Sequence, residues 1–85
     1  MLEEALFLDL CSGSGAMGFE ALSRGAAHAT LVDSHPSAIL AIKQNAELLD
    51  VKAQVHIVKS KAQTFLEKAT DQFDIIFIDP PYEGD

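Results

Sequence analysis

The sequence is short of several residue types. Its 85 residues include one cysteine, no tryptophan, and six lysine or arginine residues against 13 acidic ones. A single cysteine excludes a disulfide within the chain and is typical of a reducing compartment. The net charge of −7 argues against a large phosphate-binding surface on this chain, because nucleic-acid binding depends on Lys and Arg.

The chain also has no long apolar run and no linker-like segment. No apolar stretch approaches the roughly 20 residues that a membrane-spanning helix needs. The first four residues, Met-Leu-Glu-Glu, are acidic where a secretion signal is basic. With no internal repeat and no Pro/Gly/Ser-rich tract, 85 residues make at most one small domain. We therefore expect a single domain over residues 1–85, located in the cytoplasm.

The most informative stretch runs from Phe7 to Gly18 and reads FLDLCSGSGAMG. An apolar run at its start predicts a buried strand that ends at Asp9. The glycines then follow the spacing G-x-G-x-x-G, and a helical pattern comes after them. Glycine allows a positive φ and a close approach to a ligand, and free N–H groups at a helix start bind polar atoms. The pattern favours a site for a nucleoside-containing cofactor; a purely structural glycine turn is the alternative.

Apolar periodicity divides the chain into alternating strands and helices. This alternation indicates an α/β fold, with a parallel sheet and helices on its faces. We expect strands over Ala5–Asp9, Ala29–Asp33, Gln54–Val58 and Phe73–Ile78, and helices over Ala16–Arg24, Pro36–Leu49 and Ala62–Lys68.

The same spacing predicts which side chains are buried. Apolar residues three or four positions apart form one face of a helix that packs on a sheet. The first helix has such a stripe at Met17, Ala21 and Leu22, and the second at Ile39, Ile42, Ala46 and Leu49. The run Ile75–Ile78 is apolar at every position, which predicts a strand buried on both sides.

Three strands end in an aspartate: Asp9, Asp33 and Asp79. In parallel α/β sheets, ligands bind beyond the carboxyl ends of the strands. Asp33 also lies twenty residues past Gly13, a spacing found in nucleotide-binding folds. We therefore expect these carboxylates to converge on one site.

The fourth strand is followed by Asp79-Pro80-Pro81-Tyr82. The prolines stiffen the backbone and have no N–H, so the Asp79 carboxylate and the Pro80 carbonyl form an acceptor-rich loop. Such a loop suits a substrate that brings an amino group, and the Tyr82 ring could stack on a planar base. A strand terminator with a packed tyrosine is the alternative.

These motifs together resemble the class I S-adenosylmethionine-dependent methyltransferases. Within them the chain is most similar to the bacterial family that methylates a guanine N2 in small-subunit (16S) ribosomal RNA. The resemblance covers nearly all of residues 6–82 and rests on three stretches, LDLCSGSGAMGFEALSRGA from Leu8, Leu31–Asp33 and FDIIFIDPPY from Phe73. It implies a Rossmann-like fold with strand order 3-2-1-4, the cofactor S-adenosylmethionine and a ribosomal RNA substrate.

The resemblance also implies roles for individual residues. Asp33 would accept hydrogen bonds from the ribose hydroxyls, and Ser34 or His35 would border the adenine. Lys61, where relatives often carry Asp or Asn, and Ala62 would flank the adenine on its other side. The methionine end would be lined by the first strand end and the glycine loop, at Asp9, Ser12, Gly13, Ser14 and Gly15, with Gly18 completing the motif. Catalysis would fall to Asp79, Pro80, Pro81 and Tyr82, which would hold the target amine and stack on the base.

Other functions stay open at this point. The motif at Asp79 also occurs in N6-adenine and other amino-methyltransferases, and the glycine pattern fits a dinucleotide-binding oxidoreductase. A third alternative is a non-catalytic remnant that binds a cofactor or a partner. Because the family's sheet has seven strands, strand four would be an exposed edge, and we expect a partner or further segment to cover it.

Several residues are not expected to carry chemistry. Cys11 is most simply a small filler, and the three histidines lack metal-ligand spacing, so no metal site is expected. Glu20 is expected to be solvated, and Asn45 to bond a nearby loop. The phenylalanines are expected in the core, at Phe19, Phe65 and Phe73.

Overall fold

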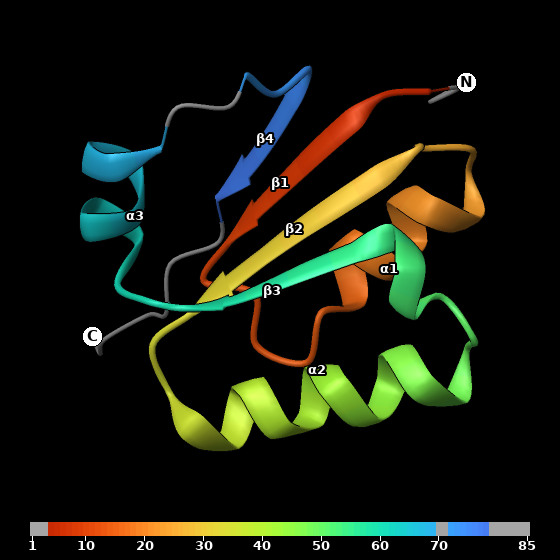
Figure 1. Cartoon of the computed structure of the whole chain (residues 1–85), viewed down its shortest axis with the longest axis horizontal. Coiled ribbons are helices and arrows are strands. Elements are labelled where there is room, and N and C mark those ends of the chain that lie inside the picture. Colours follow the sequence, from red (N-terminus) through yellow and green to blue (C-terminus); the bar gives the residue numbers. More distant parts are fainter. Residues whose placement is uncertain (1–3, 70–71, 79–85) are drawn as a thin grey trace.

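The computed structural model describes residues 4–69 and 72–78, in which strands and helices alternate (Figure 1). Every element expected from the sequence is present, with ends within two residues of those predicted. Gln54 belongs to a short 3₁₀ helix instead of a strand, and Phe73 precedes the last strand. The elements are β1 Leu6–Leu10, α1 Ala16–Ser23, β2 His28–Asp33, α2 Pro36–Leu48, η1 Lys52–Gln54, β3 Val55–Lys59, α3 Ala62–Lys68 and β4 Ile75–Ile78.

The four strands form one parallel sheet in the order β3-β2-β1-β4, which confirms the predicted order. Asp9 of β1 lies opposite Leu31 of β2 and Phe77 of β4. The chain runs outward from β1 to β3 and then returns to the far side of β1. The strand order therefore reverses between β1 and β4, and this reversal is where α/β sheets bind ligands at their carboxyl ends.

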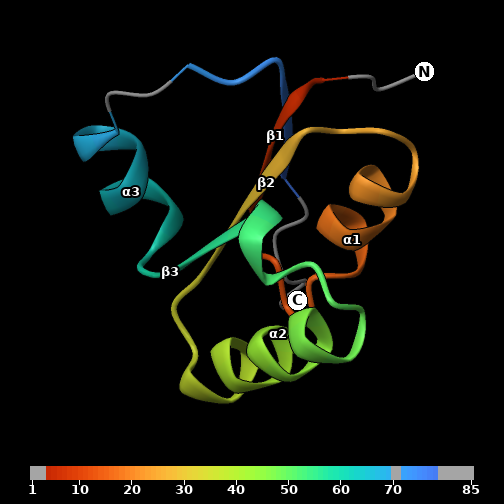
Figure 2. The same ribbon diagram turned by 45° about the vertical axis from the view of Figure 1, so that its right-hand side comes forward.

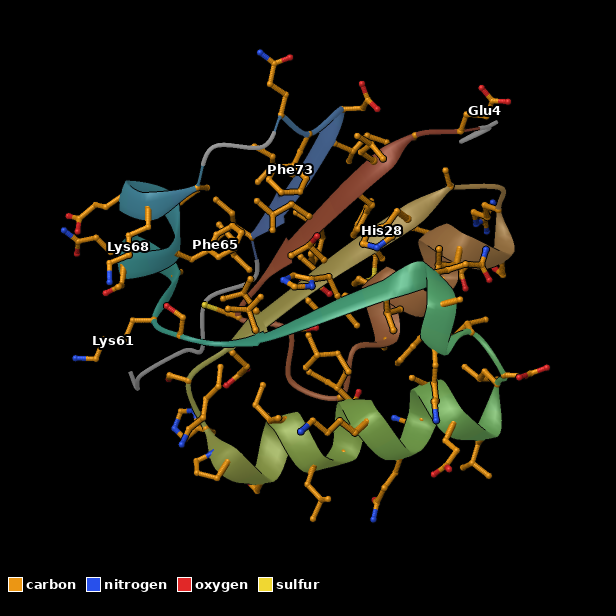
Figure 3. All side chains as sticks on the ribbon, in the orientation of Figure 1. Glu4, His28, Lys61, Phe65, Lys68 and Phe73 are labelled. Carbon is orange, nitrogen blue, oxygen red and sulfur yellow. The ribbon has the colours of Figure 1, made fainter. Side chains whose placement is uncertain are left out.

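The helices cover the sheet unequally. Figure 2 shows α1 and α2 on one face and α3 on the other. The first face holds the larger core, where Ile39 and Ile42 of α2 pack with Phe7 and Leu31. On the second face, Phe65 of α3 packs on a smaller cluster of Leu8, Leu10 and Val32. Figure 3 shows Phe65 and Phe73 on facing segments, with ring centroids 6.3 Å apart.

Two helix positions predicted to be buried are exposed instead. Met17 is 41% exposed because Gly18 and Ala21 are the residues of α1 that face the sheet, and Met17 lies about 100° around the helix from Gly18. Leu49 is 56% exposed because it caps α2 beyond Ala46, the last buried residue of that helix.

The prediction that β4 is buried on both sides is wrong. Ile75 and Phe77 face the α1–α2 side and are partly buried, whereas Ile76 and Ile78 are 52% and 57% exposed. The reason is the position of α3, which packs over β1 and β2 and leaves these two side chains of β4 uncovered within the described part of the chain. An apolar run therefore identified the strand but not the neighbours that cover it.

Candidate functional site

The loop between β1 and α1 is anchored on the carboxyl end of β2. The Ser12 N–H donates to the Val32 carbonyl at 2.9 Å, and the Gly15 N–H donates to the Ser12 carbonyl at 2.9 Å. Gly13 and Gly15 have φ values of +62° and +85°, a region that side chains with a Cβ avoid. The two glycines therefore let the chain turn sharply from the strand into the helix.

The three glycines of the motif have different surroundings. A Cβ on Gly13 would meet no atom within 4 Å, so this point of the loop is open to an approaching molecule. A Cβ on Gly15 would come within 2.7 Å of the Phe19 ring. Gly18 is buried, and a Cβ there would overlap the side chain of Leu31. The structure thus places Gly18, predicted as part of the cofactor site, in the contact between α1 and β2.

Asp33 joins the end of β2 to the glycine loop. The Gly13 N–H donates to Asp33 Oδ2 at 2.9 Å, and the His35 N–H donates to Oδ1 at 2.9 Å. The His35 ring nitrogen Nδ1 lies 3.2 Å from the same Oδ1. Two residues that are twenty positions apart in the sequence are therefore in direct contact.

The pKa of Asp33 lies below its ordinary value of 3.8. Burial of the carboxyl group raises this pKa, but the backbone N–H groups of His35 and Gly13 stabilise the charged form, and the His35 ring adds to their effect. Together they outweigh the burial, so Asp33 is a carboxylate at neutral pH. A fixed negative charge at a strand end favours ligands that bring hydroxyl or amino donors.

A second carboxylate lies on the neighbouring strand. Asp9 is 2% exposed, and the Ser12 hydroxyl donates to its Oδ2 at 3.1 Å. The charged Asp33 beside the glycine loop suits a positively charged ligand better than a pyrophosphate. The N–H groups of Gly13 and Gly15, which could hold a phosphate, are already bonded within the protein.

The loop has one more support, from α2. The Asn45 side chain donates through Nδ2 to the Ser14 carbonyl at 3.1 Å. This confirms the expectation that Asn45 bonds a nearby loop. The sequence alone does not show that this loop is the glycine loop, so Asn45 is a residue of the site that sequence reasoning missed. The sequence feature that could have identified Asn45 is a polar residue close to the apolar face of α2.

The remaining predicted cofactor residues lie in two turns next to Asp33, one after β2 and one after β3. Ser34 and His35 follow it directly and are exposed. The Ser60 N–H donates to the Asp33 carbonyl at 2.9 Å, which brings the turn between β3 and α3 next to β2. In that turn Ala62 packs toward Leu8 and Val32, whereas the Lys61 side chain points away from the sheet (Figure 3).

The four predicted catalytic residues, Asp79, Pro80, Pro81 and Tyr82, lie outside the described residues. Within residues 4–69 and 72–78, no group of three potential metal ligands comes together. In the same described part, no helix is long and apolar enough to cross a membrane.

Glu20 pairs with Arg24 at 2.7 Å on the surface of α1, in line with its predicted solvated role.

Comparison with known proteins gives consistent matches. The model of a family described as conserved hypothetical protein 95 matches residues 1–85. The "Ribosomal RNA small subunit methyltransferase D" of Buchnera aphidicola is 41% identical over 76 residues, covering 88% of this chain and 39% of that protein. The protein of the same name from Escherichia coli is 39% identical over 83 residues, covering 96% and 41%. This chain thus spans about two fifths of the length of these relatives.

A solved structure shows the same fold. The structure titled "Putative methyltransferase yhhF from Escherichia coli" superposes with a TM-score of 0.89 at 36% identity. The match covers 96% of this chain and 46% of the other. The parallel sheet of order 3-2-1-4 described above is therefore the Rossmann-like fold of known methyltransferases.

Proposed function

The chain belongs to the family described as conserved hypothetical protein 95, and we propose that it binds S-adenosylmethionine as part of a ribosomal RNA methyltransferase. The observation that supports this proposal is the contact between the Asp33 carboxylate and the Gly13 N–H, since Asp33, beside the glycine loop, is the proposed ribose acceptor. A guanine N2 in 16S ribosomal RNA is the proposed target. Another nucleic-acid amine, such as adenine N6, is the alternative. A ribosomal RNA substrate would locate the protein in the cytoplasm.

The residues of the site fit this cofactor. S-adenosylmethionine supplies a methyl group on a positively charged sulfur, and the Asp33 carboxylate gives this end of the sheet negative charge. Each carboxylate oxygen has two lone pairs, so Asp33 Oδ2 can accept a ribose hydroxyl while it keeps the Gly13 N–H. Asp9 and the loop from Ser12 to Gly15 would hold the methionine end.

The adenine would lie between the two turns that meet at Asp33. Ser34 and His35 would border one side, and Lys61 and Ala62 the other. The Lys61 ammonium cannot accept a hydrogen bond, and its side chain points away from the sheet (Figure 3). Backbone groups would therefore bind the adenine amino group in this chain.

The chemistry of transfer is proposed for Asp79, Pro80, Pro81 and Tyr82. The Asp79 carboxylate and the Pro80 carbonyl would accept the N–H groups of the target amine and localise its lone pair on nitrogen. Pro81 would keep this segment rigid, and Tyr82 would stack on the extruded base. Positioning would supply most of the rate enhancement, because the methylated nitrogen loses its proton readily.

The RNA itself needs more positive charge than this chain offers. The net charge of −7 opposes binding to phosphates, and Ile76 and Ile78 leave one side of β4 apolar and exposed. We propose that a further segment or a partner supplies the basic surface and covers β4.

Titration calorimetry of the purified 85-residue chain tests the cofactor assignment. We expect saturable binding of S-adenosylmethionine and none of NAD. Asp33→Ala should weaken binding at least tenfold, since a charged acceptor contributes about 1.5–3 kcal/mol. The control Asp79→Ala removes a carboxylate proposed for the substrate amine and should bind like the original chain. A folded chain that binds NAD, or neither ligand, would contradict the proposal.

A further inference from the structure

Asn45 of α2 reaches across to the loop between β1 and α1, which lies beside α2 in Figure 1. Its Nδ2 donates to the Ser14 carbonyl at 3.1 Å, joining residues 31 positions apart in the sequence. The rest of α2 contacts the sheet through apolar side chains such as Ile39, Ile42 and Ala46. The polar contact from Asn45 to the loop is therefore independent of the apolar contacts that pack α2 on the sheet.

The contact holds one end of a single peptide group. The Ser14 carbonyl accepts from Asn45, while the Gly15 N–H of the same peptide group donates to the Ser12 carbonyl at 2.9 Å. This peptide bond is trans, so its C=O and N–H point in opposite directions. A group bonded at both ends cannot rotate without breaking a hydrogen bond.

A clamp of this kind matters because glycines lie on either side. Gly13 and Gly15 have positive φ values of +62° and +85°, yet glycine adopts negative φ about as readily. Ser14 is exposed, so burial does not fix the tip of the loop. Without the Asn45 bond, the peptide group between Ser14 and Gly15 would be held at its N–H end alone. A ligand that needs the present conformation would then have to restrict this group when it binds.

We propose that Asn45 is a positioning residue that keeps the glycine loop in its ligand-binding conformation before the ligand arrives. The proposal rests on the proposed function, because the ligand is taken to be S-adenosylmethionine. Asn45 acts through the Ser14 carbonyl and is not a catalytic residue. Its contribution appears as cofactor affinity and as local order of the loop.

The test replaces the amide by a carboxylate of the same shape. Asn45→Asp removes the N–H donor, and Gln44→Glu makes the matched change at the neighbouring exposed position of α2. We expect the Kd for S-adenosylmethionine, measured by calorimetry, to rise about five- to tenfold in Asn45→Asp, because one hydrogen bond is lost. It should stay within twofold in Gln44→Glu. Asn45→Ala removes the donor without adding a charge and repeats the test if Asn45→Asp does not fold.

Amide hydrogen exchange, measured by NMR without ligand, separates positioning from general stability. We expect faster exchange at Gly13 and Gly15 in the Asn45 variants and unchanged protection in β1 and β2. Unchanged affinity, or a uniform loss of protection with a lower unfolding midpoint, would overturn the proposal. If the original chain does not bind S-adenosylmethionine, the proposed function fails. The exchange at Gly13 and Gly15 still shows whether Asn45 holds the loop.

Discussion

Among single residues, Asp33 connects the most parts of the site. Its side chain accepts N–H groups from Gly13 and His35, and its backbone carbonyl accepts from Ser60. The glycine loop, the start of α2 and the end of β3 therefore all meet at one residue. The two bonds to the side chain are stronger when the carboxyl group is charged, because a carboxylate is a better acceptor than its protonated form.

Asp33 should make the stability of the fold depend on pH. Its pKa is lowered in the folded state, so its contribution to stability is complete above the ordinary pKa of 3.8 and is lost as the pH falls through the folded value. At pH 7 we expect Asp33→Asn to lower the free energy of unfolding by about 1–2 kcal/mol, since a charged acceptor is lost.

Urea unfolding between pH 7 and pH 3 checks this prediction. The difference in free energy of unfolding between the original chain and Asp33→Asn should become smaller below about pH 4. Glu47→Gln, a change on the exposed surface of α2, serves as the control and should show no such gap. A gap that stays constant with pH would show that the charge of Asp33 is not the cause.

Among the elements, α1 is placed by its close contact with β2. Gly18 faces the sheet, and Leu31 of β2 fills the space where a Cβ would lie. The contact sets how closely α1 approaches the sheet, and therefore how the preceding loop meets Asp33. A glycine is destabilising inside a helix by about 1 kcal/mol relative to alanine, so its presence here reflects packing.

Gly18→Ala should therefore destabilise the chain although alanine favours helices. We expect a loss of about 1–3 kcal/mol from overpacking, measured by urea unfolding. Met17→Ala, at an exposed position of the same helix, is the control and should change stability by less. Adding Leu31→Val to Gly18→Ala should recover part of the loss, because the smaller side chain makes room. A Gly18→Ala chain as stable as the original would refute the packing role.

For the whole molecule, neither the negative net charge nor the exposed apolar strand suits the proposed RNA substrate. The chain carries −7, and β4 lies at one edge of the sheet with Ile76 and Ile78 about half exposed. An apolar edge strand favours association with other chains. The 85-residue chain should therefore associate as its concentration rises.

Replacing one exposed side chain of β4 should reduce this association. We expect Ile76→Lys to shift sedimentation velocity profiles toward the monomer, because a charged edge strand pairs poorly. Leu48→Lys is the control, since Leu48 is 82% exposed on α2, away from β4. Circular dichroism should show both variants folded. If Leu48→Lys reduces association as much as Ile76→Lys does, β4 is not the surface responsible.

The local features of this protein follow from its sequence. Gly13, Gly15 and Pro36 place the loop and the start of α2 through their own backbone preferences, and Gly25 ends α1 with a φ of +106°. The alternation of apolar runs indicates the α/β class, and the aspartate at the end of the second strand pattern lies at the carboxyl end of β2 as expected. Each of these depends on residues that act within one segment, or on a recurrent spacing.

The contacts of each side chain depend on how the elements pack together. Gly18, predicted as part of the cofactor site, packs against Leu31, and Asn45, which was not expected in the site, bonds the glycine loop. The run at Ile76 gave no sign that one of its sides would lie uncovered. Burial and hydrogen bonding depend on which elements pack together, and the pattern within a single segment does not carry that information.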